Sequence, residues 1–442
     1  MNYRQSLIYL DEIQKSGVKF GLDNVRTVLR SFGHPESKFP SIHVAGTNGK
    51  GSVCAMLSRI LSESGFRVGL YTSPHLVHPE ERFRIGDRLI PRPAFCRLLT
   101  RLKGRVDVLV RSGELASPPT HFEHLTCLAF LYFAEKKVDM AIIEVGLGGR
   151  FDATNVIQPL VSVITSIARD HTEFLGTTVG KIAYEKAGII KPGVPVVCGI
   201  AGGEALKVVK RRAAEQWAPL IKVFEEDRDF QAVKGRKGYR FLFRKDGVEY
   251  RFRPALRGWH QGRNAAVAIT TAGVLSRVWK NLPKAKIVSG IEKAEWEGRL
   301  EVFGRRPLVI LDGAHNEDGA AAVAAYLRAF TPAPRILVFA VMKDKAIRKM
   351  ALRLFPPARH IILTGIPYAR AALPEDVRRR APEFSGRMVL EPDAGKAFGN
   401  ALAMAGKRGT VLITGSLFLV GEIKKRFGHE FSLSTKPPLV SS

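Results

Sequence analysis

The sequence predicts an α/β protein with two domains: a larger domain that holds a parallel sheet, a phosphate-binding loop and a small β subdomain, followed by a smaller Rossmann-like α/β domain. Three observations predict this fold class. Short apolar runs alternate with helical stretches, as in parallel sheets that are covered on both faces. A glycine-rich loop joins the first of these runs to a helix. The pattern breaks at residues 293–306 and then starts again, so we expect domains at 1–292 and 307–431 joined by that linker.

The elements of the first domain follow from hydrophobic periodicity. Residues 1–40 combine apolar positions at roughly helical spacing with a loop. Beyond them, five short β-rich runs are separated by helical stretches, of which residues 121–136 form the clearest. We therefore expect parallel strands at 41–45, 67–71, 138–145, 160–165 and 194–200.

Residues 207–253 have a different texture, with 14 Lys or Arg against 7 Asp or Glu. Two alternating runs, 239–243 and 248–252, flank Asp246-Gly247, which is a strong hairpin signal. Aromatic and basic side chains interleave there. The segment is therefore either a nucleic-acid surface or a small antiparallel subdomain whose basic positions face solvent, and we favour the second interpretation.

The second domain repeats the alternation of strands and helices after a helix at 259–280. The first strand, 307–312, precedes a helix at 318–330. The final residues, 432–442, are expected to be a disordered tail. Further strands are expected at 335–341, 360–364, 387–390 and 409–414.

The composition is that of an ordinary globular chain of 442 residues, with 45% hydrophobic and 25% charged residues. The four cysteines are widely spaced and form no CxxC pair, which disfavours a zinc site or a redox pair. No apolar run approaches the ~18 residues that a membrane span needs, and the N-terminus lacks a signal-peptide pattern. We therefore expect a cytoplasmic protein with no membrane partner.

The formal net charge is unusual, because 69 Lys and Arg against 41 Asp and Glu give +28. Such a surplus attracts polyanions, whether nucleic acid, nucleotides or a polycarboxylate substrate. A solubility or thermal-adaptation trait explains it equally well. The charge therefore does not by itself choose a function.

The most informative segment is the glycine-rich loop that follows the run at 41–45. Its backbone N–H groups, the next helix N-terminus and Lys50 can together hold phosphate oxygens. The match to GxxxxGK[ST] is imperfect. Val44 stands at the first glycine position, and Gly51 replaces the hydroxyl residue that usually binds Mg²⁺, so the metal needs an oxygen from elsewhere. The loop comprises Gly46, Thr47, Asn48, Gly49, Lys50, Gly51 and Ser52.

Polar side chains also follow other predicted strands. Glu144 ends the run at 138–145, where it is either a natural Mg²⁺ ligand or a carboxylate paired with a surface Lys. His171 follows the next strand, and a lone histidine is usually structural. The run Asp312–Asn316 either contacts a ligand or forms an Asx-type turn that caps the next helix.

Glu185 and Lys186 lie in a helical tetrad that looks exposed. As bare residues they are more typical of solvated charges than of a site.

Taken together, these segments resemble the folylpolyglutamate synthase and dihydrofolate synthase family, within the Mur-ligase superfamily of ATP-dependent amide ligases. The resemblance runs over nearly the whole chain, and so many motifs in one order are highly specific. The matching segments are His43–Ser52, Thr72–Leu76, Phe122-Glu123, Glu144–Asn155, Asp170–Glu173, Glu185–Lys191, Leu311–Asn316 and Thr414–Leu417.

The resemblance implies that the first domain is a P-loop ATPase domain of the Mur-ligase central type, and it assigns ATP and metal roles. The loop with Lys50 holds the ATP phosphates. Lys186 matches the lysine that is carbamylated in this superfamily. Mg²⁺ is bound by Ser73, Glu144 and His171, and ATP further by Asn264, Arg299 and Asp312.

The resemblance also implies where the acceptor and glutamate bind. The pterin of a folate or dihydropteroate is expected near Phe20, Gly21, Pro74, His75 and Phe122. Ser416 falls on the L-glutamate side of a C-terminal glutamate-ligase domain. His315 is a candidate to accept a proton from the attacking amine.

The implied reaction is ATP-dependent ligation of glutamate to folates, to dihydropteroate, or to both, through an acyl phosphate, by a monomer. Two other functions are alternatives. A wall-precursor Mur ligase usually carries an additional N-terminal domain, for which the ~45 residues before the loop leave no room. A nucleic-acid-binding P-loop ATPase is suggested only by the +28 charge.

Overall fold

The computed structural model describes residues 1–14, 21–226, 229–236 and 238–435. The chain forms two compact units. The first comprises residues 1–231, 241–253 and 263–294, and the second comprises 232–240, 254–262 and 295–442. The main division thus falls inside the expected linker, but two segments from before it belong to the second unit. Each unit is described by itself.

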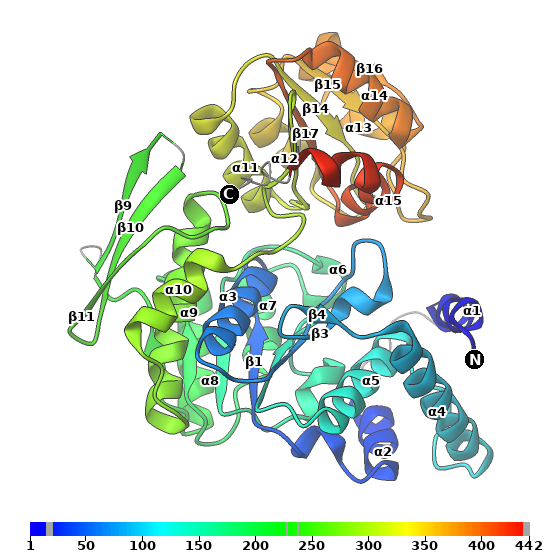
Figure 1. The fold of residues 1–442 in the computed structure, drawn as a ribbon, viewed down its shortest axis with the longest axis vertical. Coiled ribbons are helices and arrows are strands. Elements are labelled where there is room, and N and C mark those ends of the chain that lie inside the picture. Colours follow the sequence, from blue (N-terminus) through cyan, green and yellow to red (C-terminus); the bar gives the residue numbers. More distant parts are fainter. Residues whose placement is uncertain (15–20, 227–228, 237, 436–442) are drawn as a thin grey trace, which may run out of the picture. The chain divides into compact units, whose positions relative to one another are not determined.

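The first unit is built on an eight-stranded sheet of order β4-β3-β2-β5-β1-β6-β7-β8. Figure 1 labels its strands β1, β3 and β4. Strands β2, β5, β1, β6, β7 and β8 are parallel to one another, whereas the edge strands β3 and β4 are antiparallel to their neighbours. All five expected strands are present, so the predicted parallel sheet is confirmed; β3, β4 and β8 extend it at the edges. The strands are β1 (Ser41–Ala45), β2 (Val68–Tyr71), β3 (Phe83–Ile85), β4 (Arg88–Leu89), β5 (Met140–Glu144), β6 (Val161–Ile164), β7 (Val196–Cys198) and β8 (Leu220–Lys222).

Helices cover this sheet, and their buried faces follow the apolar spacing of the sequence. Helix α3 contacts β1, β2 and β5, and α10 packs on α3. Helix α5 begins with a capping box: the Thr120 hydroxyl accepts the Glu123 N–H, and the Glu123 carboxylate accepts the Thr120 N–H. The helices are α1 (Tyr3–Gln14), α2 (Asp23–Ser31), α3 (Lys50–Glu63), α4 (Arg92–Arg111), α5 (His121–Glu135), α6 (Thr172–Leu175), α7 (Val179–Ala187), α8 (Gly203–Glu215), α9 (Trp259–Val278) and α10 (Lys284–Lys293).

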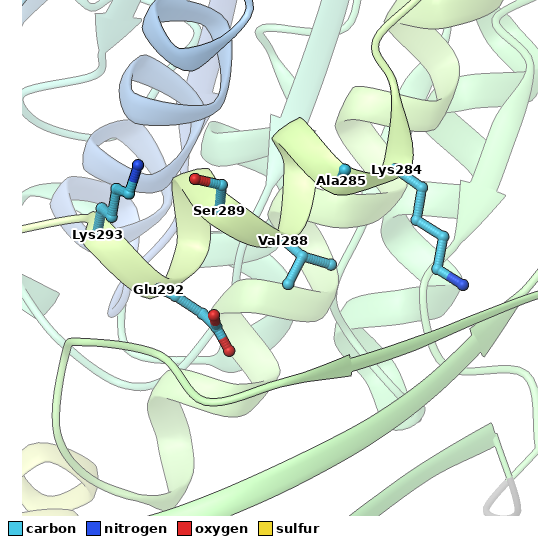
Figure 2. A pocket seen from close by; sticks show the side chains of 6 residues that line it. All are labelled: Lys284, Ala285, Val288, Ser289, Glu292 and Lys293. Atoms are coloured by element: carbon cyan, nitrogen blue, oxygen red, sulfur yellow. The ribbon is translucent and has the colours of Figure 1, made fainter.

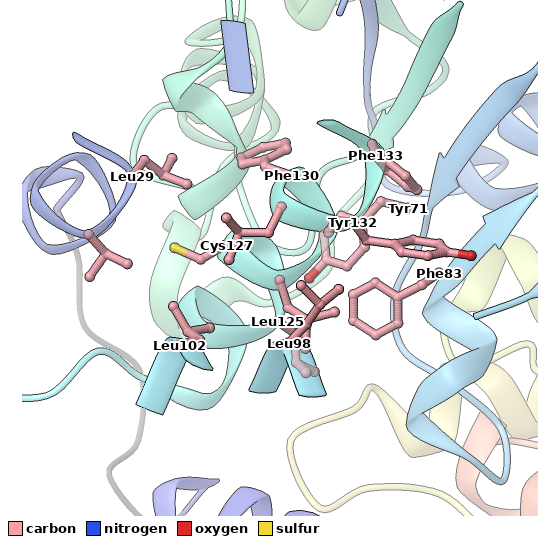
Figure 3. Close-up of a cluster of buried hydrophobic side chains, with 14 of the residues drawn as sticks. Leu29, Tyr71, Phe83, Leu98, Leu102, Leu125, Cys127, Phe130, Tyr132 and Phe133 are labelled. Carbon is pink, nitrogen blue, oxygen red and sulfur yellow. The ribbon is translucent and has the colours of Figure 1, made fainter. Parts of the chain in front are cut away.

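A large apolar core joins α2, α4 and α5 to strands β2, β3 and β5 (Figure 3). Phe133 of α5 lies so close to β2 that a Cβ on Gly69 would stand 2.9 Å from its ring. Glycine at this position therefore lets helix and strand approach. This core supports the strand ends that carry the predicted acceptor loop.

The segment 207–253 contains the predicted hairpin. Strands β10 (Gly238–Lys245) and β11 (Val248–Phe252) are antiparallel and turn at Asp246 and Gly247, which both have positive φ. A third strand, β9 (Phe230–Gly235), completes the small sheet. Its arginines are exposed, as expected for a subdomain with solvated basic positions, and most of its aromatic side chains are buried; the buried aromatics are Phe241, Phe243, Tyr250 and Phe252.

The second unit is a six-stranded sheet of order β12-β13-β17-β14-β15-β16, parallel except for the edge strand β12. The five expected strands are present. The expected linker is not wholly a connection, because β12 forms inside it. The strands are β12 (Glu301–Arg305), β13 (Leu308–Leu311), β14 (Arg335–Phe339), β15 (His360–Leu363), β16 (Met388–Leu390) and β17 (Thr410–Thr414).

The last helix corrects one prediction. Helix α15 continues to Thr435, so residues 432–435 are helical, not part of a disordered tail; residues 436–442 lie outside the described residues. Phe431 explains the extension, because its ring stacks on Phe303 at 4.9 Å between centroids. The helices of this unit are α11 (Glu317–Phe330), α12 (Ile347–Leu354), α13 (Pro374–Arg380), α14 (Ala394–Ala405) and α15 (Leu417–Thr435). Within the described ranges, no helix has both the length and the apolar character needed to cross a membrane.

Candidate active site

The phosphate-loop geometry is present where β1 ends and α3 begins. Gly46 has φ +152° and Gly49 has φ +85°, in the left-handed region that glycine favours. A Cβ on Gly46 would stand 2.0 Å from the Thr165 hydroxyl oxygen, and a Cβ on Gly49 would stand 2.4 Å from Asn264 Oδ1. Glycine is therefore required at both positions, because a side chain would clash with a neighbouring atom. The second contact also brings Asn264, predicted to bind ATP, against the loop.

The loop after β6 holds the phosphate loop through hydrogen bonds to Thr47 and Asn48, including a pair between Thr47 Oγ1 and the backbone of Ala168. The Thr47 backbone N–H donates to the Ser166 carbonyl at 2.7 Å, and the Asn48 N–H donates to Ser166 Oγ at 3.0 Å. The hydroxyls of Thr165 and Ser166 both donate to the Asn48 carbonyl, at 2.7 and 2.9 Å. Sequence reasoning missed these two residues. Their signal is a Thr-Ser pair at the carboxyl end of the strand that pairs with β1.

Two lysines converge on one carbonyl of the loop. Lys50 Nζ and Lys186 Nζ each donate to the Gly46 carbonyl oxygen at 3.0 Å. The arrangement places two potential positive charges where phosphate oxygens would bind.

Lys186 is buried, with 5% of its surface exposed, so its interpretation as a solvated charge is wrong. Helix α7 turns the face formed by Ile182, Ala183, Lys186 and Ala187 inward. Burial, and then the nearby positive charge of Lys50, lower the pKa of Lys186 to about 7, while Asp170 and Asp152 oppose the shift. Glu185 is partly exposed and pairs with Arg150 at 2.9 Å, as expected of a surface charge.

Glu144 and Ser73 are brought together at the ends of β5 and β2. Glu144 is buried, and its Oε2 accepts a hydrogen bond from the Ser73 backbone N–H at 3.1 Å. The register pairs Glu144 with Val44 of β1, two residues before the phosphate loop. The buried Arg82 lies near this carboxylate. Burial lowers the pKa of the Arg82 guanidinium, and the negative charge of Glu144 partly offsets that lowering.

His171 lies at the start of α6, with a left-handed φ of +50° and a partly exposed side chain next to Asp170. Among the residues that the structure describes, no group of three or more His, Cys, Asp or Glu side chains is arranged to hold a metal ion. The predicted Mg²⁺ set needs no such group, because it contains one carboxylate, one imidazole and one hydroxyl. A buried carboxylate beside a hydroxyl and a phosphate loop fits Mg²⁺, which takes few protein ligands and keeps waters and phosphates.

The predicted acceptor loop, Ser73–Leu76, is held rigidly. Glu81 accepts hydrogen bonds from three consecutive backbone N–H groups, at 2.7, 2.9 and 2.7 Å. Arg82 Nε donates to His75 Nδ1 at 2.9 Å. Burial, then Arg82, lowers the pKa of His75 to about 3, so its ring is neutral and can accept this bond at neutral pH. The donors to Glu81 belong to Leu76, Val77 and His78.

Phe122 lies between Gly146, two residues after Glu144, and Tyr71, two residues before Ser73. Its ring lies over Gly146, where a Cβ would stand 2.5 Å from the ring, and beside Tyr71 of β2 at 6.2 Å between centroids. Pro74, in the Ser73–Leu76 loop, is exposed. Gly21 precedes α2 with φ +141° and faces open space, and Phe20 lies outside the described residues.

The second unit brings Arg299, Asp312 and His315 together around Gly313. The buried Asp312 carboxylate accepts the N–H groups of Leu300 and Ala314, both at 2.8 Å, and burial raises its pKa. A Cβ on Gly313 would stand 3.5 Å from Arg299 Nη1. His315 Nδ1 is 2.9 Å from the Gly313 carbonyl oxygen.

Ser416 is buried at the start of α15, where its Oγ accepts the Phe418 N–H at 3.1 Å. The neighbouring Leu417 packs on Gly313, since a Cβ there would stand 2.2 Å from Leu417 Cδ2. Ser416 therefore lies beside the Asp312–His315 turn.

A surface hollow of ≈860 Å³ lies along α10, away from these residues in sequence (Figure 2). Two of its lining side chains, Ser289 and Lys293, hold Glu63 at the end of α3, at 3.0 and 2.8 Å. No predicted site residue lines it, so it is not the predicted site. The lining residues are Lys284, Ala285, Val288, Ser289, Glu292 and Lys293.

The chain is similar to known proteins over nearly its whole length. The family described as Mur ligase middle domain matches residues 44–272, and that described as Mur ligase, glutamate ligase domain matches residues 298–417. The dihydrofolate synthase/folylpolyglutamate synthase of Bacillus subtilis is 39% identical over 429 residues, which are 96% of this chain and 99% of that protein.

Solved structures agree. The Mycobacterium tuberculosis folylpolyglutamate synthase complexed with ADP has a TM-score of 0.88 at 29% identity, covering 97% of this chain and 99% of that one. The structure of E. coli FolC in complex with DHPP and ADP has a TM-score of 0.85 at 28% identity, covering 97% and 98%.

Proposed function

The chain belongs to the dihydrofolate synthase/folylpolyglutamate synthase family of Mur-type ligases, and on this premise we propose how its residues act. It is an ATP-dependent ligase that adds L-glutamate to folates and to dihydropteroate. The observation that best supports the assignment of residues is the convergence of Lys50 and Lys186 on the Gly46 carbonyl. Lys50 at this loop supplies the positive charge that the phosphates of ATP require, and Lys186 lies at the same place as the amine that we propose to carry a carbamate.

The first step activates a carboxylate, which by itself does not react with an amine at neutral pH. The γ-phosphoryl group of ATP passes to the acceptor carboxylate and gives an acyl phosphate. Lys50 and the N–H groups of the phosphate loop hold the negative charge of the transferring group, which is the main source of catalysis in phosphoryl transfer. Arg299 contributes a further positive charge to the γ-phosphate, Asp312 binds the ribose, and Asn264 meets the base.

Ser73, Glu144 and His171 would hold Mg²⁺, which would supply positive charge to the phosphates. Glu144 is already held in place by the Ser73 N–H. CO₂ adds to the neutral amine of Lys186 and one amine proton is released, which leaves an anionic carbamate. The pKa lowered to about 7 leaves part of this amine neutral at neutral pH, which supports the proposed modification.

The second step forms the amide. The neutral amine of L-glutamate attacks the acyl phosphate, and inorganic phosphate leaves. His315 accepts the proton that the amine loses, and Ser416 lies on the glutamate side. The pterin rests against Phe122 and the Ser73–Leu76 loop, with Phe20 and Gly21 at its other side.

The test of this function is glutamate-dependent phosphate release with dihydropteroate and with tetrahydrofolate as separate acceptors, at matched ATP. Turnover of both is expected, because the two reactions differ only in the reach from the pterin to the carboxylate. Lys50→Ala should abolish both while thermal unfolding stays unchanged. Turnover of tetrahydrofolate alone would refute the dihydropteroate activity, and turnover of neither would refute the proposal.

The same assay separates the remaining alternative, a nucleic-acid-dependent ATPase. Stimulation of ATP hydrolysis by DNA or RNA, and not by acceptor plus glutamate, would favour it. We further propose that the enzyme acts in the cytoplasm as a monomer. Light scattering on the purified protein measures its mass and so tests the monomeric state.

A further inference from the structure

A partly buried lysine ties the turn that carries Arg299 to helix α15. Lys424 Nζ donates to Glu301 Oε1 at 2.9 Å and Oε2 at 3.2 Å, and it also pairs with Glu297. The Lys424 side chain is only 14% exposed, against 52% for Glu297. The pKa of Lys424 is raised, because the two carboxylates outweigh the lowering by burial. This group therefore stays charged through neutral pH.

The Glu301 carboxylate also shapes the turn itself. Its Oε2 accepts the Gly298 N–H at 2.7 Å, and the Gly298 carbonyl accepts the Gly313 N–H at 2.8 Å. On the other side of Arg299, Leu300 is fully buried, has a left-handed φ of +47°, and donates its N–H to Asp312. Both neighbours of Arg299 are thus fixed, so the origin of its side chain is fixed as well.

Helix α15 begins directly after Ser416, and Lys424 lies about two turns along it. One helix therefore starts at the loop assigned to glutamate and holds the turn assigned to the γ-phosphate. The triad Glu297–Glu301–Lys424 lies outside both assigned contacts and is not needed for any step described above.

We propose that Lys424 is a positioning residue: through Glu297 and Glu301 it holds the turn that directs Arg299 to the γ-phosphate of ATP. This inference rests on the proposed role of Arg299. A purely structural ion pair would change the stability of the unit. A positioning group must also change how the enzyme uses ATP, and its effect must vanish when Arg299 is absent.

Helix α15 supplies a matched control. Arg426, two residues beyond Lys424, bridges Asp393 at 2.9 Å and Glu422, and its side chain is 38% exposed. Arg426→Met and Lys424→Met each remove one cation that holds two carboxylates, from the same helix. Only the second cation touches the Arg299 turn.

The experiment measures KM for ATP, KM for glutamate, kcat and thermal unfolding for Lys424→Met, Arg426→Met, Arg299→Ala and the double variant Arg299→Ala/Lys424→Met. We expect Lys424→Met to raise KM for ATP or lower kcat by about tenfold, with Lys424→Arg restoring much of the loss. Arg426→Met should leave these constants unchanged. The double variant should have the same kinetic constants as Arg299→Ala, because Lys424 acts only through Arg299.

The outcomes are separable. Full additivity of Lys424→Met and Arg299→Ala, or equal effects of Lys424→Met and Arg426→Met, would overturn the positioning role. Normal kinetics of Arg299→Ala would instead overturn the assigned role of Arg299 and this inference with it. If Lys424→Met does not fold, Glu301→Gln, which removes one charge and keeps the side-chain length, takes its place in the same cycle.

Discussion

At the scale of single residues, Lys186 shows how much the surroundings decide. In the sequence it stands next to Glu185 on a helix, and nothing distinguishes the two charges. The fold buries Lys186 against Gly46 and leaves Glu185 partly exposed and paired with Arg150. Burial beside Lys50 then lowers the pKa of Lys186 to about 7. The reactivity of this amine is therefore a product of packing.

This environment predicts a pH dependence. The ammonium form dominates below the pKa and cannot add CO₂, whereas the neutral amine dominates above it. After removal of CO₂, the rate at which a fixed concentration of dissolved CO₂ restores activity should rise with pH and level off above about 7, where the rate for an ordinary lysine would still be rising. A reactivation rate that keeps increasing beyond pH 9 would show that the pKa is not lowered.

Replacement of the same residue gives a second expectation. Lys186→Ala should retain less than about 1% of activity, and a short carboxylate such as acetate should restore part of it by supplying the missing anion. Lys181→Ala, an exposed position on the same helix, serves as the control. Full activity of Lys186→Ala without acetate would contradict the carbamate role.

At the scale of elements, the phosphate loop offers a test with a matched pair of glycines. Gly49 and Gly65 flank α3 with similar φ values of +85° and +90°, so alanine strains the backbone alike, by about 1–2 kcal/mol. Only at Gly49 would the added Cβ strike Asn264.

We therefore expect Gly49→Ala to weaken ATP binding by about tenfold or more, while Gly65→Ala binds ATP normally and both lose similar stability. Isothermal titration with a non-hydrolysable ATP analogue, together with thermal unfolding, measures the two quantities. Equal ATP affinity in the two variants would show that the contact with Asn264 has no part in binding.

The parallel strands were predictable from the sequence because each is a continuous buried apolar run. The edge strands β3, β4 and β12 were not, since they are short and partly exposed and carry charged residues such as Arg88 and Glu301. Likewise, the end of α15 depends on the stacking of Phe431 on Phe303, a contact between distant segments.

The site divides in the same way. The phosphate loop has a local glycine pattern and could be found by spacing, whereas the hydrogen bonds that Asn48 receives from Thr165 and Ser166 come from 117 and 118 residues away in the sequence. The grouping of Ser73 with Glu144 likewise depends on the order of strands in the sheet. Spacing reveals local motifs, and only the fold reveals which of them meet.

At the scale of the whole molecule, the +28 charge has a testable consequence. Each glutamate added to a folate brings further negative charge, and attraction between exposed charges is screened over about 8 Å at physiological salt. The KM for a long polyglutamate acceptor should therefore rise more steeply with salt than the KM for a monoglutamate acceptor. Parallel salt dependence of the two would show that the basic surplus has no part in holding the product.

The central claim is that both acceptors are activated as acyl phosphates, and an oxygen-18 transfer experiment tests it most directly. The acceptor carboxylate is labelled with oxygen-18, ATP and glutamate are added, and the released phosphate is analysed by mass spectrometry. Attack of that carboxylate on the γ-phosphorus leaves one labelled oxygen in the phosphate when glutamate displaces it. We expect singly labelled phosphate in step with amide formation for dihydropteroate and for tetrahydrofolate, whereas unlabelled phosphate alongside amide product would contradict the mechanism.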